Sequence, residues 1–497
     1  MKRFIALGLL LLSFFTLFAQ DFSSEGTAFH IDGRFPNVTY MGSDDHSFYT
    51  YKVDVHKEIM ITFNKGDINN LNVSTTKNLN IPIRPYAYNT FKGHCSVHLY
   101  YVHNKILIFY SLLQSGDYHI FLKILDSDFN EISTQQIGLI EETGYELRGS
   151  MEYAFSPDKK MVMLASTNYC ERKKAIGTNA NDAVYEKTEL AWFNTDTGEK
   201  LYSKFLPVET ESYRISTSDY LIDNNGNMSC LLLYYDKARQ GIGPSRGVLG
   251  ANTCYSKFKQ EELTTNEIKL TEEDKSIRNL FGQLKNGDVI YYGITQTRCL
   301  YKCINMAKGT ATVEKEYLKP SHLELENIKQ VFEAEDGYYL VGEKRSGFDD
   351  PCDISVIKMD KTGEYLWDKT LPNKANYSYY GFNRNADYSN YKTIFINNTL
   401  QFILLEKKNT DPDTDDHTSV INGNEFLQYD KLLSGSNMVC YSINSNGKIG
   451  TKKVLHENDK AKGVVPYSGD IILPDGKLLL NYCGPDGMIQ FVELKVK

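Results

Sequence analysis

The chain has 497 residues, with 55 Lys or Arg against 63 Asp or Glu, and its formal net charge is −8 at pH 7. This acidic balance argues against a nucleic-acid partner, because binding along a phosphate backbone needs a basic surface. The 35 Tyr and 25 Phe favour strands over helices, since aromatic rings pack well on a pleated, half-buried surface.

The N-terminus resembles a secretory signal. A basic pair precedes an apolar run from Phe4 to Ala19, and polar residues resume at once. This pattern is typical of a signal peptide, with cleavage expected after Ala19. The run is shorter than the roughly 20 residues that span a bilayer, which is the argument against an uncleaved anchor. We expect residues 1–19 to be a signal peptide, 20–497 to be an exported periplasmic or extracellular domain, and the mature chain to have no transmembrane segment.

A repeated unit then runs through the chain: an apolar run, a tight turn and a second, denser apolar run. The turns are rich in Asn, Asp and Gly, which tolerate the positive φ found at the centre of hairpin turns. The dense runs are short and apolar on both faces, as expected of strands buried between neighbouring sheets. The turns fall near residues 103, 158, 225, 286, 336, 397 and 475, and a weaker unit has Glu58–Phe63 as its core strand.

A second turn follows in several units, for instance at Asp360–Gly363 and Asn444–Gly447. Two hairpins per unit make four strands, which is one propeller blade. The sequence therefore predicts an all-β fold, a single β-propeller of seven or eight four-stranded blades with loop insertions. An array of β-sandwiches and two smaller propellers are the alternatives.

The mean repeat of about 62 residues exceeds the 40–50 of compact propellers, so we expect insertions. Three stretches break the rhythm, at about 170–187, 236–256 and 408–436. Long loops on a rigid scaffold are common recognition sites, but they are also tolerated at little entropic cost. Both interpretations stay open.

The C-terminal unit is one strand short, because the chain ends after its third strand. We expect the N-terminal segment around Phe29–Tyr40 to supply the missing strand. Such closure would remove an exposed sheet edge, which otherwise invites aggregation.

Two segments carry a resemblance to a known group of proteins. The run Gly337–Gly342, followed by Ile354–Met359 and Asp360–Thr370, resembles the repeats of exported bacterial β-propellers. The sequence Phe-Ser-Pro-Asp at 155–158 is similar to the WD40-like repeats of cell-envelope propellers. The resemblance covers single blades, and it implies a fold rather than an activity.

The acidic stretch of the third insertion is a calcium candidate. Asp411, Asp413 and Asp415 alternate as in a calcium loop, where oxygen ligands surround the ion. Asp416 stands where such a loop needs Gly, and Asn422 where it needs Glu. The other interpretation is a solvated acidic loop, and we expect no other cofactor.

Histidine and cysteine give weaker signals. His94, His98 and His103 lie close together with Cys95, and imidazole and thiolate are zinc ligands, but no carboxylate stands at a suitable spacing, and packed or surface histidines are the preferred interpretation. The nine Cys are an odd number, which leaves at least one unpaired thiol in an exported chain. Most of them are expected to be small buried residues, and Cys299 and Cys303 to share one strand face.

Neither a Walker loop nor a dinucleotide fingerprint occurs in the sequence. The leading hypothesis is a non-enzymatic cell-envelope binding or scaffold protein that engages another envelope protein, such as an outer-membrane transport or secretion complex. The alternative is a hydrolase or lyase acting on glycans or peptides in the central funnel, with catalytic residues that the sequence does not identify. A funnel lined by Asp, Glu, His or Arg would favour the enzyme.

Overall fold

A computed structural model of the chain defines the fold. The structure describes residues 24–25, 29–30, 38–55, 58–82, 97–114, 117–140, 150–171, 184–206, 213–236, 248–269, 278–295, 297–320, 327–344, 353–371, 391–407, 436–457, 463–464, 471–472, 477–483 and 488–495. These ranges contain strands and turns but no helix. Accordingly, none of the described residues belongs to a helix long and apolar enough to cross a membrane.

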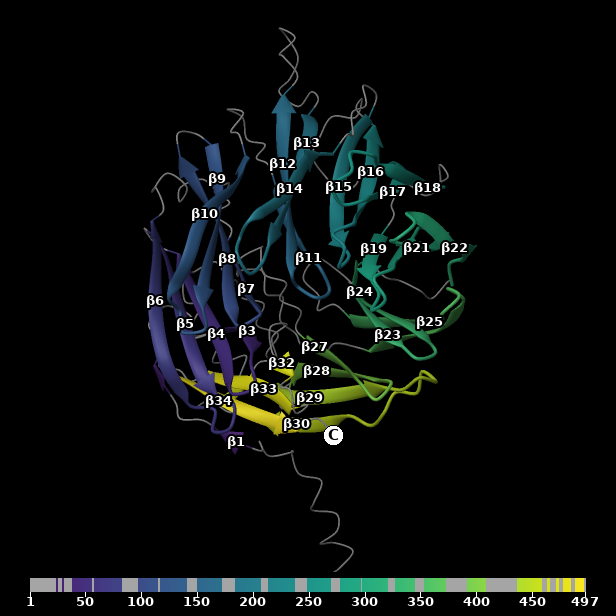
Figure 1. The fold of residues 1–497 in the computed structure, drawn as a ribbon. Helices are drawn as coiled ribbons and strands as arrows, with labels where there is room; N and C mark the ends of the chain where they lie inside the picture. Colours follow the sequence, from purple (N-terminus) through teal and green to yellow (C-terminus); the bar gives the residue numbers. More distant parts are fainter. Residues whose placement is uncertain are drawn as a thin grey trace, which may run out of the picture.

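Seven four-stranded antiparallel sheets form the blades of a propeller (Figure 1). Blade 1 comprises β3 (Thr39–Ser43), β4 (Ser47–Val55), β5 (Glu58–Asp67) and β6 (Val73–Pro82), and blade 2 comprises β7 (Val97–Val102), β8 (Lys105–Gln114), β9 (Asp117–Asp126) and β10 (Glu131–Ile140). Blade 3 comprises β11 (Ser150–Phe155), β12 (Met161–Glu171), β13 (Val184–Asn194) and β14 (Lys200–Phe205), and blade 4 comprises β15 (Tyr213–Ile222), β16 (Met228–Asp236), β17 (Val248–Ser256) and β18 (Thr264–Ile268).

The remaining blades repeat the same order. Blade 5 comprises β19 (Arg278–Gln283), β20 (Val289–Ile294), β21 (Arg298–Asn305) and β22 (Thr310–Leu318), and blade 6 comprises β23 (Asn327–Ala334), β24 (Gly337–Lys344), β25 (Asp353–Asp360) and β26 (Tyr365–Leu371). Blade 7 comprises β27 (Tyr391–Ile396), β28 (Thr399–Lys407), β29 (Ser436–Ile443) and β30 (Lys453–Glu457). The predicted all-β propeller of four-stranded blades is confirmed.

A further sheet, which we call the closing sheet, combines both ends of the chain. It contains β1 (Ser24–Glu25), β2 (Phe29–His30), β31 (Gly463–Val464), β32 (Ile471–Ile472), β33 (Lys477–Cys483) and β34 (Met488–Lys495), and both β1 and β2 pair with β34. The prediction that N-terminal residues complete the last unit is confirmed for Phe29, which lies opposite Ile489. It was wrong for Thr39 and Tyr40, which begin β3 of blade 1.

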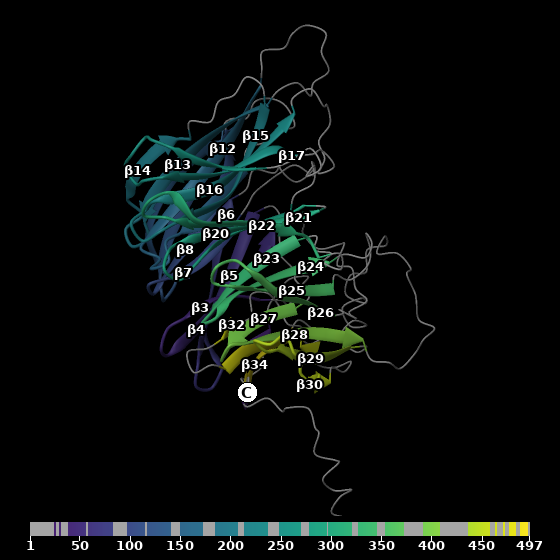
Figure 2. The same ribbon diagram turned by 90° about the vertical axis from the view of Figure 1, so that its right-hand side faces the viewer.

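The closing sheet packs against blade 1 and so closes the ring. Phe48 of β4 meets Phe491 of β34 edge-on, with ring centroids 4.7 Å apart. Both belong to a buried cluster with Leu71 and Leu479. Figure 2, which shows the ring from the side, places β34 beside β3 and β4, as Figure 1 does.

The core lies between the faces of neighbouring blades. The dense apolar runs of the seven clear units are the second strands of their sheets, β8, β12, β16, β20, β24, β28 and β33, and each has a neighbouring strand on both sides. The core strand predicted for the weaker unit, Glu58–Phe63, lies instead in β5, the third strand of blade 1. Leu107 and Phe109 of blade 2, for example, form one buried cluster with Val162 and Leu164 of blade 3. Such strands are covered on both faces, which is why their sequences show no polar alternation.

Four of the hairpin turns share one hydrogen-bonding pattern. The Asp223 carboxylate accepts the backbone N–H groups of Asn225 at 2.9 Å and Asn227 at 2.8 Å, while Gly226 takes φ 81°. Asp126, Asp360 and Asn444 make the same pair of bonds two and four residues ahead. A short side chain that bonds its own backbone, followed by a residue in the left-handed region, explains the Asn, Asp and Gly of the predicted turns.

Candidate functional site

The two faces of the ring differ. One face, called the turn face, carries the tight turns that join the first to the second strand and the third to the fourth strand of each blade. The opposite loop face carries the connections between second and third strands and between blades, because the strands of each sheet alternate in direction. All three predicted insertions join second to third strands: β12 to β13, β16 to β17 and β28 to β29. They therefore begin and end at the loop face.

The insertion bounds change with the structure. Residues 248–256 of the predicted 236–256 stretch form β17, so 237–247 remain between the strands. In the other two predicted insertions, residues 172–183 and 408–435 lie between the strands. These three segments lie outside the described residues, as do the predicted signal peptide 1–19 and the calcium candidates Asp411, Asp413 and Asp415.

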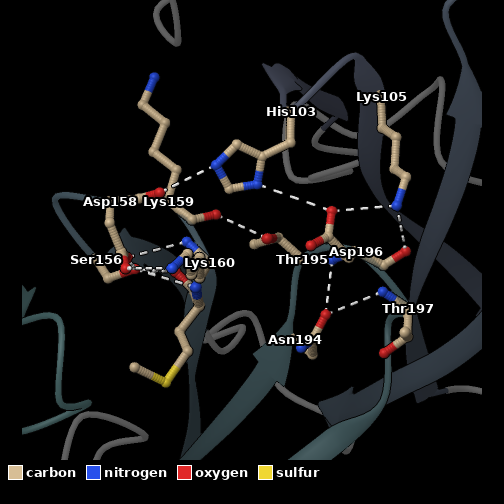
Figure 3. A network of polar contacts seen from close by, with 11 residues as sticks. His103, Lys105, Ser156, Asp158, Lys159, Lys160, Asn194, Thr195, Asp196 and Thr197 are labelled. Atoms are coloured by element: carbon tan, nitrogen blue, oxygen red, sulfur yellow. Dashed lines mark hydrogen bonds and ion pairs between the residues drawn. The ribbon is translucent and has the colours of Figure 1, made fainter.

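The turn face is a network of contacts between blades (Figure 3). Lys105 of blade 2 donates to the Asp196 backbone oxygen at 2.9 Å and to its carboxylate at 3.1 Å in blade 3. The His103 ring lies 3.1 Å from the backbone oxygen of Asp158, and the Asp158 N–H donates to Asn224 of blade 4 at 2.9 Å. The network links three consecutive blades through turn residues, and we assign it a structural role.

The predicted histidine cluster does not assemble in the part that is described. His98 lies on inner strand β7 and His103 in the turn after it, while His94 and Cys95 fall outside the described ranges. No three His, Cys, Asp or Glu side chains among the described residues are grouped so that they could hold a metal ion. Cys299 and Cys303 are both buried on β21 in one cluster, as predicted.

First strands lie nearest the ring axis, since β3 contacts β7, β11 contacts β15, and β19 contacts both β15 and β23 (Figure 1). On blades 2 and 3 these inner strands carry an aromatic cluster. The His98 ring lies 5.3 Å from the Tyr153 ring, and Tyr100 lies 4.6 Å from Phe155. Burial lowers the pKa of His98 and raises that of Tyr100 to about 12. This part of the inner wall is therefore aromatic and uncharged at neutral pH.

A carboxyl pair lies beside this cluster. Glu152 of β11 is flanked on the next inner strand, β15, by Asp219, whose backbone N–H donates to the Glu152 carboxylate. Burial and the nearby Asp219 charge both raise the pKa of Glu152, and the hydrogen bond from Asp219 lowers it. The net result is a Glu152 pKa of about 7. Asp219 is exposed, has φ 57° and sits where the β15–β16 pairing shifts register. Asp is one of the residue types that tolerate this left-handed conformation, and here it coincides with the break in strand register.

Glu152 has the properties of a proton donor. A carboxyl that holds its proton to about pH 7 can act as a general acid or donate a hydrogen bond at physiological pH. The sequence showed one available signal, an acidic residue within the otherwise apolar Met151–Phe155 segment. Its partner could not be identified from the sequence, because Asp219 lies in a different blade.

No family model matches the chain, and no curated protein matches it. Among solved structures, the Dos1 propeller is similar over 95% of both chains, with 9% identity and a TM-score of 0.45. The polysaccharide lyase Uly1 is similar over 79% of this chain and 95% of its own, with 12% identity and a TM-score of 0.40. Prolyl oligopeptidase B from Galerina marginata is similar over 93% of this chain and 56% of its own, with 11% identity and a TM-score of 0.39. These likenesses concern the fold alone.

Proposed function

We propose that the protein is an exported, non-enzymatic binding or scaffold module of the cell envelope that engages another envelope protein through its loop face. A transport or secretion complex of the outer membrane is the class of partner we expect. The observation that carries this proposal is the difference between the two faces of the ring. Tight turns form one face, while the sequence expansions between second and third strands all begin and end at the other.

The ring is suited to this role because its turn face is braced. Lys65 of blade 1 pairs with Asp128 of blade 2 at 2.7 Å, and Lys315 of blade 5 pairs with Glu364 of blade 6 at 2.6 Å. Exposed pairs of this kind each contribute little stability, but similar pairs join blade 1 to blade 2 and blade 5 to blade 6. Variable connections on a rigid scaffold are where recognition usually resides.

Loop replacement tests the proposal. Lys407 and Ser436 lie directly opposite each other on β28 and β29, so an Asn-Gly turn can replace 408–435 without changing the register. Glu171 and Val184 are opposite in the same way, which permits the same replacement of 172–183. We expect at least one replacement to abolish co-purification of a partner from gently solubilised envelopes.

The matched control changes the turn face. Asn398→Gly keeps the two-residue turn between β27 and β28, whose residues Asn397 and Asn398 already have φ 50° and 58°, and it should leave the partner bound. Recovery of the wild-type protein alone would contradict the proposal, as would partner binding that survives replacement of 172–183, 237–247 and 408–435 together.

A second candidate function is a hydrolase or lyase acting on glycans or peptides at the ring axis, and the Glu152 carboxyl favours it. With Glu152 as general acid, Glu152→Gln should lower kcat by about 10²–10⁴, the usual contribution of a positioned proton donor. Glycan and peptide panels assayed with wild-type and variant protein provide the measurement. Equal turnover by both proteins would exclude Glu152 as the acid.

The same variant has a stability signature that shows whether it is folded. The folded carboxyl keeps its proton to about pH 7, whereas the unfolded one loses it near 4.5, so wild-type stability falls as pH rises between these values. Glu152→Gln removes this penalty. We expect the variant to be more stable by about 2 kcal/mol at pH 8 and equally stable at pH 4. Urea unfolding at both pH values measures the difference, with the exposed Glu335→Gln as the matched control.

A further inference from the structure

Two cysteines face each other inside blade 4. Cys230 on β16 and Cys254 on β17 are direct partners in the antiparallel register. Directly opposite residues point to the same face of a sheet, with Cβ atoms about 4.5–5.5 Å apart, close to the separation across a disulfide. Their thiols are hydrogen-bonded to each other, so the side chains already point together.

The pair is sealed inside the protein. Both cysteines have an exposed fraction of 0%, and they belong to a cluster with Met163 and Trp192 of blade 3. The hydrogen bond with Cys254 and burial both raise the pKa of Cys230, which suppresses the reactive thiolate. Once blades 3 and 4 have packed together, the two cysteines are therefore kept in the redox state, dithiol or disulfide, that they already have.

We propose that Cys230 and Cys254 form a cross-strand disulfide when the chain folds in an oxidising environment. The bond would tie the two central strands of blade 4 near their turn-face ends, two residues from the Met228–Ser256 pair. None of the other cysteines with described side chains has this geometry. Cys299 lies opposite Ile294 and Tyr317, Cys303 opposite Ile290 and Val313, and Cys440 opposite Ile403 and Lys453.

The oxidant is a small-molecule or protein disulfide. One cysteine thiolate attacks the donor disulfide, forming a mixed disulfide and releasing the first donor thiol. The second cysteine then attacks the mixed disulfide, forming the Sγ–Sγ bond and releasing the second donor thiol. Both protein protons end on the donor thiols, and one electron pair passes from the two cysteine sulfurs to the donor disulfide.

Refolding in a glutathione redox buffer tests the proposal. Protein refolded from the reduced, unfolded state is denatured, its free thiols are labelled with N-ethylmaleimide, and its peptides are mapped by mass. We expect the peptides containing Cys230 and Cys254 to be joined, two hydrogens lighter than the reduced pair, and separated by dithiothreitol. Cys440 is the internal control and should carry the label. Finding the label on both Cys230 and Cys254 would overturn the proposal.

Thermal unfolding gives a second readout. A cross-link of this loop length typically stabilises a protein enough to raise Tm by a few degrees, so the oxidised protein should melt above the reduced one. A Cys230→Val/Cys254→Val variant should lose this dependence on reductant, whereas Cys440→Val should keep it. If the double variant does not fold, the wild-type peptide map still decides the outcome.

Discussion

Replacing Gly337 with alanine is expected to lower the free energy of unfolding by about 4 kcal/mol, the upper end of single-residue effects. Gly337 begins β24 with φ 154°, a backbone conformation that residues with a side chain rarely adopt. An added Cβ would overlap the backbone oxygen of Met359 on β25. That oxygen cannot move away cheaply, because Gly337 and Asp360 are register partners where the two strands pair. Urea unfolding followed by circular dichroism measures the loss.

Gly287→Ala is the matched control. Gly287 also has a positive φ, 88°, but the nearest atom to an added Cβ is the Cβ of Asp223 at 4.0 Å. Only the conformational penalty remains there, and we expect a loss of about 1 kcal/mol. Equal losses of unfolding free energy for the two variants would show that steric overlap with β25 is not the cause of the Gly337→Ala effect.

Asp336→Asn should cost about 2 kcal/mol, because it leaves the buried Lys358 cation without its counter-charge; the cost is less than for a fully buried pair, because the Asp336 side chain is 48% exposed. The Lys358 side chain is 0% exposed, and its ammonium lies 2.5 Å from the Asp336 carboxylate. The same ammonium lies 4.0 Å from the centroid of the Tyr339 ring. The ring favours the cation, but it cannot replace the carboxylate.

Lys358→Met separates the cost of the unpaired charge from the value of the pair. Methionine keeps the length and apolar stem of lysine, and replacing a buried charge with an apolar side chain is often nearly neutral. We expect a change within about 1 kcal/mol, measured by urea unfolding alongside Asp336→Asn. If both variants lose the same stability, the loss would come from removing the ion pair and not from leaving Lys358 unpaired.

The features that could be predicted are those that depend on a short stretch of sequence. The run Met161–Ala165 is apolar on both faces because β12 is covered by blades 2 and 4 through the clusters of Leu164 and Met163. Gly226 and Gly363 stand where the turn needs positive φ. Strand β22 (Thr310–Leu318) alternates between exposed and half-buried residues, as an outer strand does. Each of these signals needs only the residues beside it.

Other features depend on which strands become neighbours. The place of Thr39 in blade 1 and of Phe29 in the closing sheet follows from ring closure, and no local pattern separates the two. Val248–Ser256 contains Gly, Asn and Ser and was assigned to an insertion, yet it forms β17, because pairing with β16 and β18 satisfies its backbone.

The sequence by itself determined the all-β architecture, the repeat and the turn positions, because hydrophobic burial and turn chemistry act over a few residues. Only the tertiary structure decided what meets across strands and blades. It placed Glu152 beside Asp219, Lys358 beneath the Tyr339 ring and Cys230 opposite Cys254. These contacts set the protonation, the stability and the proposed redox chemistry. Cys230 meets Cys254, and Lys358 meets Tyr339, only when neighbouring strands of one blade pair in register. Glu152 meets Asp219 only when blades 3 and 4 pack together.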